Sequence, residues 1–405
     1  MKKILSIIVI LIVSSSMIYA QSNTAYTNQQ GASNTATQTQ TGEDNDATIY
    51  QGNFQAGWDQ NHGDASQTQT GDRNIGVIKQ RSGSWANGNG SYQIQIGDEN
   101  EAYSTMWNAA NLSDQAQNGL RNYSKVKIAG NGNSAFVRQI GDDNKAHTEL
   151  TGGVNYNHSY TSQNGNLNKA YVQAKGDQNQ MFVYQYGDEN KAGEDPWYGD
   201  NNGDGIKNVG ILLEGNNNYA YEYQSGNKNQ ATYGAYGYNN TFYGYQQGDE
   251  NIYKINQYTW KDVDNYQNFV TTYQIGDRNE AYAKLKGDMN EVHFWQYGTD
   301  NLIEGYYTKE FLAEGDNSLI NIQQWGTDNH TKGAVHNMSG EVDIYQDGTD
   351  NFTLVHIGDR LLWGNMVDVD QMGMSNNAFV KQTTGGNSAT VYQNGNSNSS
   401  TVMQH

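Results

Sequence analysis

Acidic side chains that directly follow a glycine are the first candidates for chemistry in this chain. They recur in short polar segments such as G-D-E-N and G-D-D-N. Carboxylates in glycine turns bind calcium in parallel β-rolls that repeat every nine residues. In this chain the period is eleven and the acidic position drifts. Calcium binding is therefore an alternative, and acids that keep surface turns soluble are the simpler interpretation. The acidic positions concerned are Asp98, Asp142, Asp188, Asp249, Asp277 and Asp288.

Catalytic signatures are not evident in the sequence. The eight histidines are scattered, and no H-E-x-x-H pattern brings two of them onto one helix face. Paired carboxylates are common, but they lie in polar turns where nothing would raise a pKa. Every G-x-x-N segment belongs to one repeated series instead of to a phosphate-binding loop. The sequence therefore predicts a protein that is not an enzyme and that uses no cofactor or metal.

Amide side chains recur with a fixed spacing and form the dominant pattern. The unit Q-x-G-x-x-N-x-A-x-x-x-Q repeats every eleven residues and is complete in several copies. Such a period indicates stacked identical units and not a globular core with a pocket. We expect the amides to form ladders along the stack, because buried amides are costly unless they pair. The expected ladder residues are Gln29, Gln40, Gln51, Gln139, Gln371, Gln382, Gln393, Gln404, Asn34, Asn45, Asn133, Asn376, Asn387 and Asn398.

The residues between the amides indicate the elements that position them. Each unit contains the alternation N-x-A-x-φ-x-Q (φ, an apolar residue), which has the period of two that is typical of a strand with one inward face. Glycine in x-G-x-x-N permits the positive φ of a tight turn. The expected turn glycines are Gly31, Gly42, Gly71, Gly97, Gly141, Gly373 and Gly395. The expected inward apolar residues are Ala36, Ala47, Ile49, Ala135, Val137, Ala378, Val380, Ala389, Val391 and Val402.

One strand and one turn per eleven residues predict an all-β fold. Two units, or 22 residues, complete one rung of an amyloid-like β-solenoid. About 32 strands in roughly 16 rungs would give a body about 75 Å long at the usual strand spacing. Insertions interrupt the register near residues 52–62, 81–88, 194–200, 258–267, 304–312 and 358–364, and the single proline, Pro196, lies in one of them. We expect local bulging in the middle, where Tyr233, Phe242, Tyr253 and Phe294 occupy inward positions.

Composition sets the compartment and the charge of the chain. Residues 1–20 combine two lysines with an apolar run and a small residue at Ala20, which predicts a secretory signal peptide. Residues 21–405 are predicted to form a single repeat domain. Cysteine is absent, so no disulfide framework is expected. The formal net charge of −19 argues against nucleic-acid binding.

The repeated positions resemble the curlin repeat, S-x5-Q-x-G-x2-N-x-A-x3-Q, of curli fibre subunits. The resemblance extends over about residues 23–404. It implies a secreted subunit that polymerises into extracellular functional amyloid fibres on the bacterial cell surface. It also implies a role in biofilm matrix and adhesion, with the same chain, a nucleating subunit and an outer-membrane exporter as partners.

A monomeric solenoid is the alternative to a polymer. Tyr50, Tyr171, Tyr184 and Tyr392 lie at outward positions and could form a surface-binding stripe, although β-propensity alone favours aromatics there. Monomeric solenoids need polar caps, whereas the repeat here begins at Asn23 and is well formed at Gln404. We therefore expect open edges that add further copies. Because net negative charge opposes association, assembly should be faster in added salt or acid.

Overall fold

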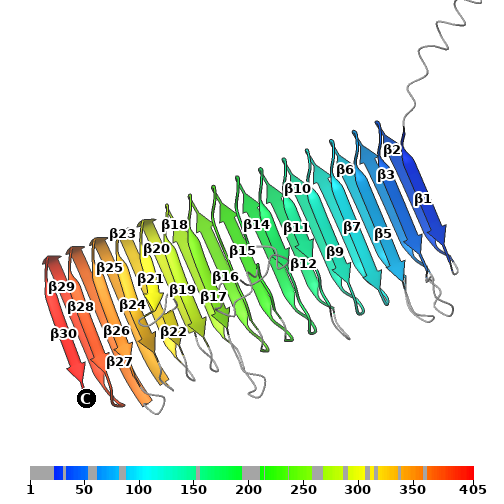
Figure 1. Ribbon diagram of the computed structural model, residues 1–405. Helices are drawn as coiled ribbons and strands as arrows, with labels where there is room; N and C mark the ends of the chain where they lie inside the picture. Colours follow the sequence, from blue (N-terminus) through cyan, green and yellow to red (C-terminus); the bar gives the residue numbers. More distant parts are fainter. Residues whose placement is uncertain are drawn as a thin grey trace, which may run out of the picture.

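The structure of the chain, a computed structural model, is an all-β solenoid of stacked parallel strands (Figure 1). No helix occurs among the residues that it describes, and so none there is long and apolar enough to cross a membrane. This confirms the predicted fold class. The described residues are 22–30, 33–52, 62–81, 88–151, 156–193, 210–213, 215–235, 237–257, 268–285, 291–305, 311–313, 318–335, 339–358 and 363–405.

One side of the solenoid is a single sheet of 15 strands, which we name the continuous side. Neighbouring strands in it are parallel and in register, as where Gln139 of one strand faces Gln163 of the next. Its strands are β2 (Thr35–Thr41), β4 (Asp64–Thr70), β6 (Gly90–Ile96), β8 (Leu112–Asn118), β10 (Ser134–Ile140), β12 (His158–Asn164), β14 (Gln180–Tyr186), β15 (Tyr219–Ser225), β16 (Thr241–Gln247), β18 (Phe269–Ile275), β20 (Glu291–Thr299), β23 (Leu319–Thr327), β25 (Ser339–Thr349), β27 (Trp363–Met374) and β29 (Ser388–Asn396).

The opposite side consists of a 7-stranded and an 8-stranded sheet, and we name it the split side. The first sheet contains β1 (Thr24–Gln29), β3 (Asp46–Gln51), β5 (Ile75–Arg81), β7 (Glu101–Trp107), β9 (Tyr123–Ile128), β11 (Lys145–Thr148) and β13 (Lys169–Val172). The second contains β17 (Ile252–Gln257), β19 (Glu280–Leu285), β21 (Leu302–Gly305), β22 (Phe311–Ala313), β24 (His330–Val335), β26 (Phe352–Ile357), β28 (Asn377–Gln382) and β30 (Ser399–Gln404).

The core is a thin layer between the two sides. Alternate residues of the strands point inward, and outside the terminal strands β1, β2 and β30 the described ones are buried, as in β10, where Ala135 and Val137 are almost inaccessible. Inward apolar residues from Met106 to Val391 join into one cluster, and a smaller cluster near the N-terminal end contains Ile49, Ala65 and Ile78. Most outward residues are half-buried or exposed, with exceptions such as Tyr171 and Thr271, and this alternation explains the period of two.

The gap in the split side coincides with large aromatic residues in the core. Between β13 and β17 only isolated bridges link the rungs, through Lys191 and Gln230. In this region Tyr233 stacks on Phe242, with ring centroids 4.3 Å apart, and Phe242 contacts Tyr253 at 5.5 Å. These rings take more space than the alanine and valine of other rungs, although Phe242 itself lies in a regularly paired strand, β16. The interruption agrees with the bulging expected for the middle of the array.

Thirty strands are described, compared with the expected number of about 32. Two rungs of the split side carry only bridges, which accounts for the difference. Several residues named in the sequence analysis, including Pro196, Gly31 and Asp288, lie outside the described residues. The predicted signal peptide also lies outside them, and the single-domain assignment remains a prediction.

Candidate functional site: the amide ladders

A ladder of glutamines runs through the whole continuous side. In each strand one glutamine donates from its Nε2 to the Oε1 of the glutamine on the next strand, over 2.7 to 3.0 Å. All fifteen strands contribute one residue. The ladder residues are Gln40, Gln69, Gln95, Gln117, Gln139, Gln163, Gln185, Gln224, Gln246, Gln274, Gln296, Gln324, Gln346, Gln371 and Gln393.

The same amides also connect the two sides of the solenoid. Gln139 Nε2 donates to the carbonyl oxygen of Tyr123 at 3.0 Å, and Gln163 Nε2 donates to that of Lys145 at 3.0 Å. Both hydrogens of these two buried NH2 groups therefore have an acceptor. An unpaired buried amide would cost about 1–3 kcal/mol by mutational data, so pairing at every rung is what permits burial of so many amides.

An asparagine ladder follows the turns that lead from the continuous side to the split side, which we name the tight turns. Every tight turn reads G-x-x-N, from residues 42–45 to residues 395–398. The backbone N–H of each asparagine donates to the Oδ1 of the asparagine one rung earlier, as from Asn144 to Asn122 at 3.1 Å. Its Nδ2 donates to the backbone carbonyl oxygen of the turn glycine one rung later, as from Asn144 to Gly165 at 2.7 Å.

Glycine begins each tight turn for two reasons. Gly42, Gly71, Gly97, Gly141, Gly373 and Gly395 have φ between +104° and +111°. A Cβ on Gly141 would also overlap the backbone carbonyl oxygen of Gly165 in the next rung. The turns stack too closely for any side chain at this position.

The acids that follow these glycines bind the backbone of the neighbouring rung. Asp98 Oδ1 accepts from the backbone N–H of Asp72 at 2.8 Å, and Asp142 Oδ1 accepts from that of Leu120 at 2.8 Å. Asn166 Oδ1 accepts from the backbone N–H of Asp142 in the same way, at 2.8 Å. Asparagine and aspartate can therefore both occupy this position. Among the described residues no group of three or more His, Asp or Glu is arranged to hold a metal ion. Asp188, Asp249 and Asp277 make the same type of hydrogen bond.

The glutamines predicted on the split side lie at its two ends. Gln29 donates to Gln51 at 2.6 Å, Gln51 donates to Gln80 at 2.9 Å, and Gln382 donates to Gln404 at 2.8 Å. After Gln80 the same column continues with Met106 and Ile128, which are fully buried. In this column the split side thus has amides at the N-terminal and C-terminal ends of the solenoid, and apolar residues such as Met106 and Ile128 follow Gln80.

The remaining predicted residues take the following places. Asn45, Asn376 and Asn398 belong to the tight-turn ladder. Asn34, Asn133 and Asn387 lie in the turns from the split side to the continuous side, which we name the variable turns. Ala36 and Val402 are partly buried in the terminal rungs. The other inward apolar residues are buried: Ala47, Ile49, Ala135, Val137, Ala378, Val380, Ala389 and Val391.

A second, shorter glutamine ladder was not predicted. Gln38 donates to Gln67 at 2.9 Å, Gln67 to Gln93 at 2.9 Å, and Gln93 to Gln115 at 2.7 Å. These amides replace the apolar inward residue in the first four strands of the continuous side. The doublet Q-x-Q, which recurs at the ends of these strands, is the sequence signal that could have revealed them.

Comparison with known families identifies one part of this array. Residues 364–395 match the model of the curlin-associated repeat. The matched segment is thus similar to a curlin-associated repeat. It runs from β27 to β29 and contains ladder residues Gln371 and Gln393. The predicted resemblance to curli subunits is thereby confirmed for this segment. No curated protein matches the chain at a significant level.

Rungs outside the matched segment have the same geometry as those inside it. The ladder bond between Gln139 and Gln163, at 2.8 Å, repeats the one between Gln371 and Gln393, at 2.7 Å. Rungs with divergent sequence therefore keep the glutamine ladder of the continuous side.

One buried acid stands apart from the ladders. Glu222 is completely buried, and neither carboxylate oxygen has a hydrogen-bond partner in the described part of the chain. Burial raises the pKa of this carboxyl well above its usual value. Gly244 on the next strand has no side chain and so leaves room for the Glu222 carboxylate in the core. A Cβ at Gly244 would overlap this carboxylate and the Tyr253 hydroxyl.

Proposed function

We propose that the chain is a secreted, non-catalytic structural subunit that polymerises end to end into extracellular curli-like amyloid fibres. The observation that carries this proposal is the common direction of the glutamine ladders. Every ladder glutamine donates toward the C-terminal rung, so one end of the stack presents amide oxygens and the other presents amide N–H groups. Ends of this kind are complementary to one another.

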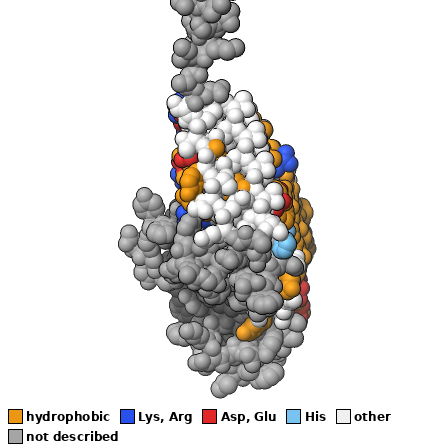
Figure 2. Space-filling model, turned by 90° about the vertical axis from the view of Figure 1, so that its right-hand side faces the viewer, with side chains coloured by type: hydrophobic (Ala, Val, Ile, Leu, Met, Phe, Trp, Pro, Cys, Tyr) orange, Lys and Arg blue, Asp and Glu red, His pale blue; other side chains and the backbone are white. Residues whose placement is uncertain are grey.

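The terminal strands supply the edges for such growth. β1 and β30 are the outermost strands of the two split-side sheets, and each pairs with one neighbour only. In Figure 2, which views the N-terminal end, the described surface that faces the viewer consists mostly of backbone and of side chains that are neither hydrophobic nor charged. Stacking β1 of one copy on β30 of another would place Gln29 next to Gln404 and would satisfy both edges.

The cellular setting follows from the curlin-associated repeat. We assign the fibre to the bacterial cell surface, with a role in biofilm matrix and adhesion. Its partners are other copies of the chain, a nucleating subunit and an outer-membrane exporter, and residues 1–20 serve as signal peptide.

Seeded polymerisation of residues 21–405 tests the proposal. The mature chain is purified in denaturant, diluted into buffer with or without preformed seeds, and followed by electron microscopy and fibre diffraction. We expect fibres with a spacing near 4.8 Å that form faster with seeds. A soluble, β-rich monomer that never responds to seeds would contradict end-to-end growth.

A monomeric adhesin is the second candidate, and outward aromatic columns favour it. On the continuous side Tyr223 stacks on Tyr245 with centroids 4.9 Å apart, and Tyr273 stacks on Trp295 at 4.6 Å. Neighbouring rungs cover the faces of these rings, so ring edges and hydroxyls remain for contact. Binding of the monomer to cell surfaces without polymerisation would favour this function.

A further inference from the structure

Three lysines form one column on the outer face of the split side, and we name them the lysine column. Lys145 of β11 pairs in register with Lys169 of β13, which pairs with Lys191 through an isolated bridge. Their backbones are one strand spacing apart, about 4.8 Å. Like charges directly opposite each other destabilise a sheet. A column of this kind therefore calls for a counter-charge.

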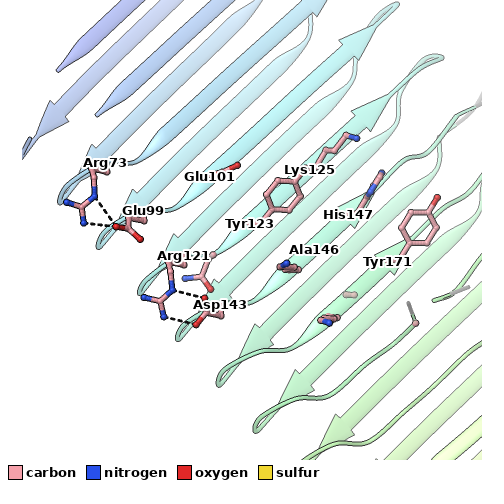
Figure 3. A pocket seen from close by; sticks show the side chains of 15 residues that line it. Arg73, Glu99, Glu101, Arg121, Tyr123, Lys125, Asp143, Ala146, His147 and Tyr171 are labelled. Carbon is pink, nitrogen blue, oxygen red and sulfur yellow. Dashed lines mark hydrogen bonds and ion pairs between the residues drawn. The ribbon is translucent and has the colours of Figure 1, made fainter. Parts of the chain in front are cut away.

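The chain does not provide that counter-charge within the described residues. Lys145 and Lys169 line a groove of about 1060 Å³, together with Tyr123 and Tyr171 (Figure 3). No ion pair joins the lysine column to a carboxylate of the described ranges. The groove keeps a surplus of positive charge in a chain whose net charge is −19.

The two arginines at the edge of the groove are already paired. Arg73 contacts Glu99 at 2.6 Å, and Arg121 contacts Asp143 at 2.7 Å. The hydrogen bond from Arg121 is the main cause that lowers the pKa of Asp143, and Lys145 makes a smaller contribution. Glu99 and Asp143 thus pair with the arginines, and Glu101, the third acid of the groove, accepts a hydrogen bond from the Tyr103 hydroxyl. The lysines of the column have no ion-pair partner among the described residues.

The opposite side of the solenoid carries an unmatched acidic patch. It consists of Glu341, Asp343 and Asp347 of β25 and Asp368 and Asp370 of β27. Asp343 pairs in register with Asp368. Burial, and next the neighbouring Asp368, raises the pKa of both Asp343 and Asp370. No ion pair neutralises this patch within the ranges that the structure describes.

The two charged surfaces fit each other in sign and in spacing. Both are columns along the solenoid axis and share the strand spacing of about 4.8 Å, so two lysines of one copy can face two aspartates of another. They lie on opposite sides of the molecule and on distant rungs, β11 and β13 against β25 and β27. A contact between them joins different surfaces and can repeat without closing.

We propose that the lysine column of one copy binds the acidic patch of a second copy, so that solenoids associate side by side with a stagger along their axes. This contact requires the solenoid fold but not growth at its ends. It gives the chain a lateral interface in addition to the terminal strands. Repetition of the contact would assemble a staggered sheet of solenoids or fibres.

Zero-length cross-linking of mixed copies tests the contact. Mature chains with light and heavy nitrogen isotopes are mixed, treated with a carbodiimide that joins amines to carboxyls, and analysed by mass spectrometry. We expect mixed-isotope links from Lys145 or Lys169 to Asp343 or Asp368. A single copy cannot produce them, because the residues lie on opposite sides and many rungs apart.

Charge reversal distinguishes a specific contact from general attraction. Charge reversal also removes the amines or carboxyls that the reagent joins, so association of the variants is measured by sedimentation instead. Lys145→Glu with Lys169→Glu should weaken it at least about tenfold, and so should Asp343→Lys with Asp368→Lys. A chain carrying all four changes should recover association. The matched controls are Lys79→Glu with Lys254→Glu on the split side, and Asp64→Lys with Asp114→Lys on the continuous side. They change the net charge equally and should leave association unchanged.

Several outcomes would overturn the proposal. One is equal loss of association in the control variants, since this would reflect net charge alone. Another is binding of polygalacturonate, a carboxylated polymer, to the groove without any link between copies, which would assign the lysine column to that class of ligand. Seeded elongation of each variant is measured separately. Loss of lateral association with normal elongation, or the converse, therefore shows which of the two interfaces has failed.

Discussion

The tight turns and the variable turns join the same two sides of the solenoid, yet they differ throughout the molecule. Tight turns keep the four residues G-x-x-N in all rungs, from residues 42–45 to residues 395–398. Variable turns differ in length, and the insertions lie in them or in the split-side rung before them, as between β3 and β4 or between β21 and β22. The neighbouring columns differ in the same way: the glutamine ladder next to the tight turns is unbroken, whereas the other is interrupted after Gln80.

This comparison shows that the two edges hold the register to different degrees. Asparagines of the variable turns also pair from rung to rung, as from Asn133 to Asn111, but only the tight turns keep one length and one glycine in every rung. A stacked turn with glycine and asparagine at fixed positions aligns each rung on the previous one through hydrogen bonds. The opposite edge then mainly has to bring the chain back, and loops of many lengths can do so because closure entropy grows slowly with length. Divergence and insertion accumulate at the edge that holds the register less strictly.

The largest expected effect separates the two kinds of turn through a glycine in each. Gly141→Ala should lower the free energy of unfolding by about 3–5 kcal/mol, because a Cβ overlaps Gly165 and the positive φ is strained. Gly386→Ala, in a variable turn, should cost only about 1–2 kcal/mol, since φ is +75° and no atom lies within 4 Å of a Cβ. Urea unfolding of the soluble chain measures both. Equal losses would contradict the division of roles between the turns.

A second prediction compares the two glutamine columns with one substitution. Gln163→Met on the continuous side leaves Gln139 without an acceptor and Gln185 without a donor, and should cost about 2–4 kcal/mol. Gln80→Met on the split side leaves one side chain, Gln51, without an acceptor, removes the bonds from Gln80 to the carbonyl oxygens of Asp64 and Asn89, and extends the apolar column of Met106. Its cost should be about 1 kcal/mol. Hydrogen exchange of the neighbouring amides reports each loss, and a larger effect at Gln80 would reverse the order of the columns.

The pH dependence of the middle rungs provides a third prediction. The folded chain raises the pKa of Glu222, so the folded state keeps a proton that the unfolded state loses near pH 4.3. Stability is therefore full below that pH and decreases as pH rises toward the folded pKa, by at most about 1.4 kcal/mol per pH unit. Glu222→Gln should remove this decrease, as measured by unfolding at pH 4 and pH 7. An unchanged slope would exclude Glu222 as its source.

The smallest expected effect concerns the C-terminal rungs. Gln382→Ala with Gln393→Ala should slow seeded elongation several-fold, because a ladder bond at the growing edge contributes about 1 kcal/mol. The single variants Gln393→Ala and Gln404→Ala then compare the continuous with the split side. If elongation from seeds is unchanged in all three variants, the C-terminal edge is not the growing face.

Much of this architecture follows from residue spacing alone. The eleven-residue period predicts strands, turns and inward positions, because stacking requires the same residue at the same place in each rung. The aromatic residues Tyr233 and Phe242 also indicated where the array would be irregular. These features are local, and each can be read within one or two units.

The difference between the two edges could not be read in this way. Gln29 and Gln40 have the same local pattern, although the first begins a column that soon becomes apolar and the second begins one that does not. Successive units alternate between the continuous and the split side. The side of a given unit can therefore be read from the sequence only if the length of every insertion before it is known. The lysine column has the same difficulty, because Lys145, Lys169 and Lys191 become neighbours only after the rungs are aligned.

The glutamine ladder also has an electrical consequence. Each amide from Gln40 to Gln393 points its N–H toward the C-terminal end and its oxygen toward the N-terminal end. Backbone dipoles largely cancel within a sheet, whereas these side-chain dipoles add along the axis. The asparagine ladder points its oxygens the opposite way, toward the C-terminal end, so the two ladders offset each other's dipoles. The polarity of the glutamine ladder therefore acts at the junction between copies: a copy added in the reverse direction would set amide oxygen against amide oxygen, so growth should keep one direction.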